Sequence, residues 1–143
     1  MDGSDRIALA AAAYGAMKPM DCQPLRDVRI LLLEDDALIS LDAEDMLLGI
    51  GASRVLVAHT VEEAEALLER ESVDVAVLDL VIGSGRCEDF ARRLVARPLP
   101  IVFASGFGGD GALPEPLRQI PTVEKPYSPQ TLHAALALVL GLS

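Results

Sequence analysis

Aromatic residues, cysteines and basic residues are all scarce in this sequence of 143 residues. It has no tryptophan and 2 cysteines, and its 12 lysines and arginines are outnumbered by 22 acidic residues, for a net charge of −10. This excess of negative charge repels phosphates, so we expect no direct binding to nucleic acid. Cys22 and Cys87 form no Cys-x-x-Cys pair, which favours a reduced, cytoplasmic setting.

The sequence also lacks a long apolar run and a basic N-terminal stretch. No run approaches the roughly 18 apolar residues that a membrane-spanning helix needs, so we expect no membrane segment. Residues 7–17 are mildly apolar but follow Asp2 and Asp5, where an export signal would carry basic residues. The length fits one domain.

Residues 1–26 are predicted to be an N-terminal extension to a domain of residues 27–143. Residues 7–17 are rich in alanine, which favours a helix. The last predicted helix, residues 129–140, is apolar on all its faces and needs a covering element. We expect the extension to pack near it, in the same chain or across a homodimer; a disordered tail is the competing interpretation.

Apolar runs alternate with amphipathic segments along the rest of the chain. Strands are predicted over residues 28–33, 54–58, 74–79, 100–105 and 122–124. Helices are predicted over residues 37–48, 60–70, 87–95 and 129–140, with room for only a short, poor helix before Gln119. Five strands each followed by a helix predict an α/β sandwich with a parallel sheet and right-handed crossovers.

Residues 75–80 form the central strand of this pattern, an apolar run that contains Asp79. Four consecutive apolar residues before an acid are typical of a strand buried on both faces. Asp79 then lies at the carboxyl edge of the sheet, where open α/β sheets bind ligands. The following residues, 81–85, are predicted to form a loop over this acid.

Four other polar side chains are expected at the same edge. Glu34 and Asp35 follow the first strand, Ser105 ends the fourth, and Lys125 follows the fifth. Clustered carboxylates repel one another unless a cation lies among them, and their oxygens suit Mg²⁺. A lysine and a hydroxyl add donors for an anion, so the set indicates a phosphoryl site. Taken singly, each residue also fits a helix N-terminus, a helix cap or a solvated loop.

The chain resembles the receiver domains of two-component response regulators over residues 27–143. The motifs that carry the resemblance are Leu31-Leu32-Leu33-Glu34-Asp35-Asp36, Val77-Leu78-Asp79-Leu80, Phe103-Ala104-Ser105-Gly106 and Glu124-Lys125-Pro126-Tyr127. The resemblance implies a flavodoxin-like (βα)5 three-layer sandwich with sheet order 2-1-3-4-5. It also implies a stand-alone receiver, since no output domain follows Ser143.

The resemblance further implies roles for the site residues. Asp79 would accept a phosphoryl group from a histidine kinase or a histidine phosphotransfer protein. Mg²⁺ would be bound by Asp35 directly, by Glu34 through water, by Asp79, and by the backbone carbonyl of Val81. Lys125 would contact the phosphoryl oxygens, and Ser105 would move to hydrogen-bond them. The Lys125–Pro126 peptide is expected to be cis.

Two positions depart from the usual receiver pattern. Gly83 stands where receivers usually have a proline, and Thr122 stands where they have an aromatic switch residue. The Phe-Ala-Ser-Gly-Phe run resembles a subgroup with a Phe-Ala-Thr-Gly-Tyr-like strand-four motif. Phe107 is therefore predicted to move with Ser105 on activation, in place of the usual switch.

The first predicted helix carries three leucines off its core face, Leu38, Leu41 and Leu48. Contiguous exposed apolar residues often form a partner site, so we predict that this stripe docks the kinase. The alternative is that the three leucines extend the core contact.

Three rival interpretations of the sequence each conflict with particular residues. Residues 106–111 match Gly-x-Gly-x-x-Gly, but Pro114 and Pro116 prevent the long helix that a dinucleotide site requires. An aspartyl-phosphate phosphatase of the haloacid dehalogenase type needs a second acid two residues after its nucleophile, and Val81 stands there. A receiver-like adaptor that takes no phosphate is opposed by the presence of Asp35, Asp79 and Lys125. The chain is thus expected to be a signalling domain rather than an enzyme.

Overall fold

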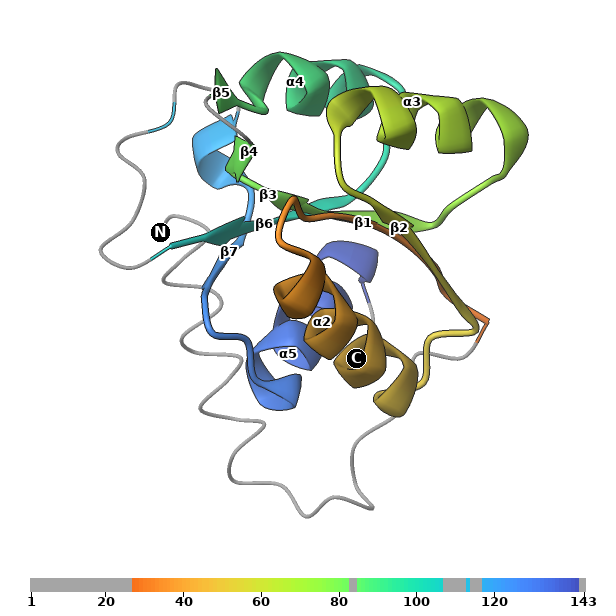
Figure 1. Ribbon diagram of the computed structural model, residues 1–143, viewed down its shortest axis with the longest axis vertical. Coiled ribbons are helices and arrows are strands. Elements are labelled where there is room, and N and C mark those ends of the chain that lie inside the picture. The colour runs from red at the N-terminus through yellow and green to blue at the C-terminus, as the bar shows by residue number, and fades with distance from the viewer. Residues whose placement is uncertain (1–26, 83–84, 107–112, 114–116, 142–143) are drawn as a thin grey trace.

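The computed structural model describes residues 27–82, 85–106, 113 and 117–141. The predicted N-terminal extension and its packing on the last helix therefore lie outside the described residues. A parallel sheet runs through the domain, with helices on both of its faces (Figure 1). The sheet comprises β1 (Arg29–Leu33), β2 (Arg54–Ala58), β3 (Val75–Asp79), β6 (Ile101–Ser105) and β7 (Thr122–Glu124). The predicted three-layer α/β arrangement is present.

The strand order is β2-β1-β3-β6-β7. The predicted order 2-1-3-4-5 is correct only when the strands of this sheet are counted alone. The sequence did not predict a separate antiparallel pair, β4 (Val81–Ile82) and β5 (Gly85–Arg86). The prediction of a loop over residues 81–85 was therefore wrong at Val81, Ile82 and Gly85, which lie in these strands. Periodicity cannot identify strands of two residues, because the pattern needs about four residues to appear.

The helices form the two outer layers. They are α2 (Ala37–Gly49), α3 (Val61–Arg70), α4 (Glu88–Ala96) and α5 (Pro129–Leu140), with a 3₁₀ turn, η2 (Leu117–Gln119), before β7. Figure 1 shows α2 and α5 on one face of the sheet and α3 and α4 on the other. Within the described ranges, no helix is long and apolar enough to cross a membrane.

Each face of the sheet has its own apolar core. Alternate side chains of β1 belong to different cores. Ile30 and Leu32 are part of the core with α2 and α5, whereas Leu31 and Leu33 are part of the core with α3 and α4. All four side chains are essentially inaccessible to solvent. Burial of a leucine or isoleucine side chain contributes about 1.5–3 kcal/mol, so the two cores hold the sheet rigid beneath its carboxyl edge.

Asp36 fixes the start of α2 directly beside that edge. Its side-chain oxygen accepts the backbone N–H groups of Leu38 at 2.9 Å and Ile39 at 3.0 Å. Such an N-cap typically contributes about 1 kcal/mol. Because the cap follows Glu34 and Asp35 immediately, these two acids lie in the short connection between β1 and α2.

Candidate functional site

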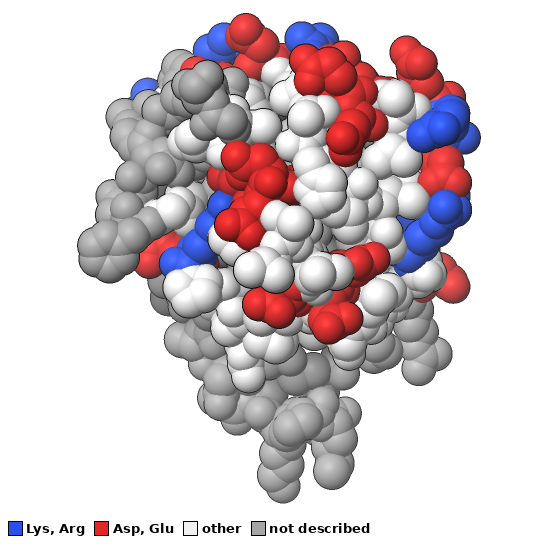
Figure 2. Space-filling view, viewed as in Figure 1, with Lys and Arg blue, Asp and Glu red and all other residues white. Residues whose placement is uncertain are grey.

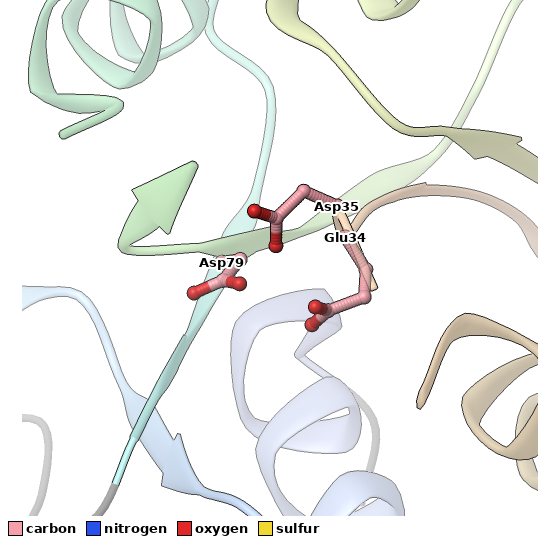
Figure 3. Close-up of side chains that lie close together, drawn as sticks. All are labelled: Glu34, Asp35 and Asp79. Carbon is pink, nitrogen blue, oxygen red and sulfur yellow. The ribbon is translucent and has the colours of Figure 1, made fainter. Parts of the chain in front are cut away.

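The carboxyl edge of the sheet gathers the predicted acids and the lysine. Figure 3 shows Glu34 and Asp35 just after β1, beside Asp79 at the end of β3. Backbone hydrogen bonds continue the ladders one residue beyond the strands: Glu34 N–H donates to the Ala58 carbonyl at 3.0 Å, and Lys125 N–H donates to the Ser105 carbonyl at 2.9 Å. Glu34, Asp79 and Lys125 are therefore held by the sheet itself.

Lys125 joins two carboxylates. Its Nζ lies 2.7 Å from Asp79 Oδ2 and 2.7 Å from Glu34 Oε2. The lysine side chain is 17% exposed, while those of Glu34 and Asp79 are 0% and 5% exposed. Burial lowers the pKa of Lys125, but its hydrogen bonds to Asp79 and Glu34 outweigh that effect and raise it. Lys125 is thus a firmly held cation between two buried acids.

Glu34 is enclosed by donors on both of its oxygens. Oε1 accepts the Asp36 N–H at 3.2 Å, and Oε2 accepts the Tyr127 hydroxyl at 3.2 Å in addition to Lys125. Burial raises the pKa of Glu34, opposed by these hydrogen bonds from Lys125 and Asp36. The net direction of the pKa is upward, so the fixed donors offset only part of the cost of burying this carboxylate.

The three carboxylates could hold a metal ion. Glu34, Asp35 and Asp79 each offer an oxygen, and these oxygens lie within 4.8 Å of one another. Opposite ligands of Mg²⁺ are about 4.2 Å apart, since each lies about 2.1 Å from the ion. In ionised form, three carboxylates and one ammonium leave two negative charges, which a divalent cation would neutralise. Figure 2 shows acidic side chains gathered on this face of the molecule.

The remaining predicted ligand, Val81, also lies against Asp79. Its backbone N–H donates to Asp79 Oδ1 at 3.1 Å, so Oδ1 and Oδ2 of this acid have different partners. Cys87 donates from Sγ to the Asp79 backbone carbonyl at 2.9 Å, which ties the start of α4 to the end of β3. The side chain and the main chain of Asp79 are therefore both fixed.

The residues predicted to act as a switch are only partly described. Ser105 is buried and follows Ala104, the residue that pairs with Asp79 across the sheet. Thr122 pairs with Phe103 at the start of β7 and is half-buried. Phe107 lies outside the described residues. The structure thus brings Ser105 next to the end of β3, the strand that carries Asp79.

The predicted docking leucines lie on α2, outside the acid cluster. Leu38 is 76%, Leu41 59% and Leu48 46% exposed, so they do not extend the core contact. Ala43 and Leu47 supply the buried face of the helix instead.

Sequence reasoning missed two contacts of the site. Tyr127 was noted only as part of a motif, yet its hydroxyl reaches Glu34. His59 lies with Nδ1 3.0 Å from the Glu34 backbone carbonyl. The sequence did carry a signal for the contact of Tyr127 with Glu34. The phenol stands two residues after Lys125, and that spacing keeps it near the sheet edge. No sequence signal linked His59 to Glu34, which is 25 residues away.

Comparison with known proteins agrees with this geometry. No family model and no curated protein matches the sequence. Among solved structures, SdrG from Sphingomonas melonis Fr1 is 33% identical, with a TM-score of 0.69 over 80% of this chain and 97% of SdrG. The BeF3-activated conformation of SdrG, from Pseudomonas melonis Fr1, is 32% identical, with a TM-score of 0.68 over 81% and 98%.

A CheY-like response regulator receiver domain from Methylobacillus flagellatus shares the fold. It is 19% identical, with a TM-score of 0.69 over 79% of this chain and 98% of that domain. The match to SdrG is closer in sequence and spans nearly all of that protein. The parallel sheet, the acid cluster and Lys125 stand at the positions that the receiver motifs predicted. The chain belongs to the response regulator receiver family.

Proposed function

We propose that this chain is a phosphoacceptor of two-component signalling. Asp79 accepts a phosphoryl group from the phosphohistidine of a histidine kinase or a histidine phosphotransfer protein, and the phosphorylated domain then signals by protein–protein contact. The observation that carries this proposal is the placement of Lys125 Nζ at 2.7 Å from Asp79 Oδ2, beside three carboxylates that could hold a divalent cation.

The proposed transfer is a simple displacement at phosphorus. An Asp79 carboxylate oxygen attacks, a P–O bond forms, and the P–N bond to the donor imidazole breaks. The imidazole nitrogen keeps the bonding electrons and takes up a proton. Such a reaction needs little covalent help from the protein, so positioning and charge stabilisation dominate. The fixed contacts of Asp79 with Val81 and Lys125 hold the nucleophile for this attack.

The other site residues stabilise the negative charge of the transferred phosphoryl group. Bound Mg²⁺ would neutralise phosphoryl oxygens, held by Asp35, Asp79, the Val81 carbonyl and, through water, Glu34. Lys125 exchanges a carboxylate for a phosphoryl oxygen, and the Ser105 hydroxyl donates to another. Lys125 is suited to this exchange because its ammonium is a compact charge on a flexible stem.

We assign the chain to the receiver subgroup with a Phe-Ala-Thr-Gly-Tyr-like motif in the fourth strand of the sheet. The support is the run Phe103-Ala104-Ser105-Gly106-Phe107 and the small residue Thr122 at the usual switch position. In this mechanism Ser105 moves toward the phosphoryl group and displaces Phe107, whereas Thr122 stays in place.

The switch is tested by NMR with beryllofluoride and Mg²⁺, which together mimic the phosphoryl group. Large chemical-shift changes are expected at Ser105 and Phe107, with small changes at Thr122, because only Ser105 and the residues that follow it are pulled toward Asp79. Unchanged signals from Phe107 in a protein whose Ser105 signals have shifted would refute this switch.

We propose that Leu38, Leu41 and Leu48 form the docking stripe for the phosphodonor protein. These three leucines on α2 are exposed, and Leu38 stands three residues after Asp35. A partner seated on them would have its phosphohistidine close to Asp79, which favours this face over one remote from the site.

Small phosphodonors test the phosphoacceptor proposal without a kinase. Acetyl phosphate with Mg²⁺ is expected to add one phosphoryl group to the protein, measured by intact mass, and a chelator should prevent the addition. If the protein gains no phosphoryl group from acetyl phosphate or from candidate kinases, the alternative of an adaptor that acts without phosphorylation would replace this proposal.

A further inference from the structure

Tyr127 joins the apolar core to the acid cluster. Its side chain is buried and belongs to the core formed with α2 and α5, where it packs with Leu132 and Ala135. Its hydroxyl leaves this core and donates to Glu34 Oε2 at 3.2 Å. Burial, together with the negative charges of Glu34 and Asp79, raises the pKa of Tyr127 well above its usual range, so the group stays a neutral donor.

Glu34 Oε2 therefore accepts hydrogen bonds from two donors, one that must move during the proposed transfer and one that is held in place. Lys125 reaches it with the same ammonium that contacts Asp79 Oδ2. In the proposed transfer Lys125 must turn to a phosphoryl oxygen, whereas the ring of Tyr127 is held by the core. Glu34 is fully buried, so bulk water does not reach Oε2 when a donor leaves. An unsatisfied buried carboxylate would oppose the movement of Lys125.

We propose that Tyr127 is a positioning residue that holds Glu34 in place while Lys125 turns to the phosphoryl group. This inference rests on the proposed phosphoacceptor function. The Tyr127 hydroxyl keeps Oε2 satisfied in both states, so the acid remains directed toward the metal site after the lysine has left. In the unphosphorylated state Lys125 already satisfies Oε2, so the hydrogen bond from Tyr127 contributes more in the phosphorylated state. The bond thereby favours the phosphorylated state.

Tyr127→Phe isolates this role, because it removes one oxygen and leaves the ring. The dissociation constant for beryllofluoride with Mg²⁺ is expected to rise roughly tenfold, since hydrogen bonds to charged groups are among the stronger ones in proteins. Ser40→Ala is the matched control: it also removes a buried hydroxyl, which donates to the Ala37 carbonyl within α2. Its affinity for beryllofluoride should equal that of the wild type.

A double variant separates positioning from mere structural support. In a Glu34→Asp background the carboxylate is one methylene shorter and no longer reaches the phenol, so adding Tyr127→Phe should leave the affinity unchanged. Free energies of unfolding, measured without metal or beryllofluoride, report the structural contribution. A Tyr127→Phe protein that is less stable but binds beryllofluoride with wild-type affinity would overturn the inference.

The wild-type protein supplies a measurement that needs no variant. The Tyr127 hydroxyl proton should be observable by NMR as a slowly exchanging signal, and it should persist when beryllofluoride and Mg²⁺ are added. Loss of that signal on saturation would overturn the inference. Failure of the wild type to bind beryllofluoride would overturn the proposed function and this inference together. If the wild type binds beryllofluoride and the Tyr127→Phe variant binds it equally well, the inference alone is overturned.

Discussion

Replacing Lys125 by methionine is expected to lower the free energy of unfolding of the metal-free protein by about 3–5 kcal/mol, the usual cost of removing one partner from a buried ion pair. Both carboxylates that contact Lys125 are at most 5% exposed, so neither can recover full hydration. Methionine keeps the length and most of the apolar stem. Urea unfolding in the presence of a chelator measures the loss.

Mg²⁺ should restore part of the stability of Lys125→Met, because a divalent cation supplies the positive charge that the acids have lost. Arg92→Met provides the control, since Arg92 pairs with Asp89 at 3.6 Å on the exposed side of α4. Exposed pairs contribute about 0–1 kcal/mol, so this variant should unfold almost like the wild type. Equal, small losses in both variants would show that Lys125 does not compensate the buried charges.

Leu41→Glu is expected to reduce phosphotransfer from the cognate kinase at least roughly tenfold, as truncation of a central interface residue typically does. Leu41 is 59% exposed, so a glutamate there leaves the core intact and places a charge in the middle of the apolar stripe. Phosphorylation by acetyl phosphate should continue at the wild-type rate. The two rates, measured on the same preparation, separate docking from chemistry.

Ala66→Glu is the matched control for charge. Ala66 is exposed on α3, on the opposite face of the sheet from α2, and the substitution adds the same negative charge to a helix. This variant should accept phosphate from both donors like the wild type. Equal loss with kinase and acetyl phosphate in Leu41→Glu would indicate misfolding and contradict the docking role.

The sequence was sufficient to place the acids and Lys125 at one edge because parallel strands share a direction. Once residues 28–33 and 74–79 were predicted as strands of one sheet, Glu34 and Asp79 had to lie near each other. The lysine followed from the last short strand. The exposure of Leu38 and Leu41 was likewise predictable, since helical spacing separates them from Ala43 and Leu47.

Contacts between side chains could not be predicted in this way. Strand pairing sets the positions of backbones, but the reach of Tyr127 to Glu34 depends on the ring packing in the core beside α5. The pairing of Val81 with Arg86 depends on two-residue strands that leave no periodic signal. Arg93 illustrates the same limit: it pairs with Glu65 of α3, a residue on another helix.

The phosphorylation of Asp79 is tested most directly by comparing the wild type with Asp79→Asn after incubation with acetyl phosphate and Mg²⁺. Asparagine keeps the size of the side chain but lacks the carboxylate oxygen that would attack phosphorus. Intact mass and peptide mapping should locate one hydroxylamine-labile phosphoryl group on Asp79 in the wild type, and none on the variant. An equal gain of that phosphoryl group by Asp79→Asn would contradict the account.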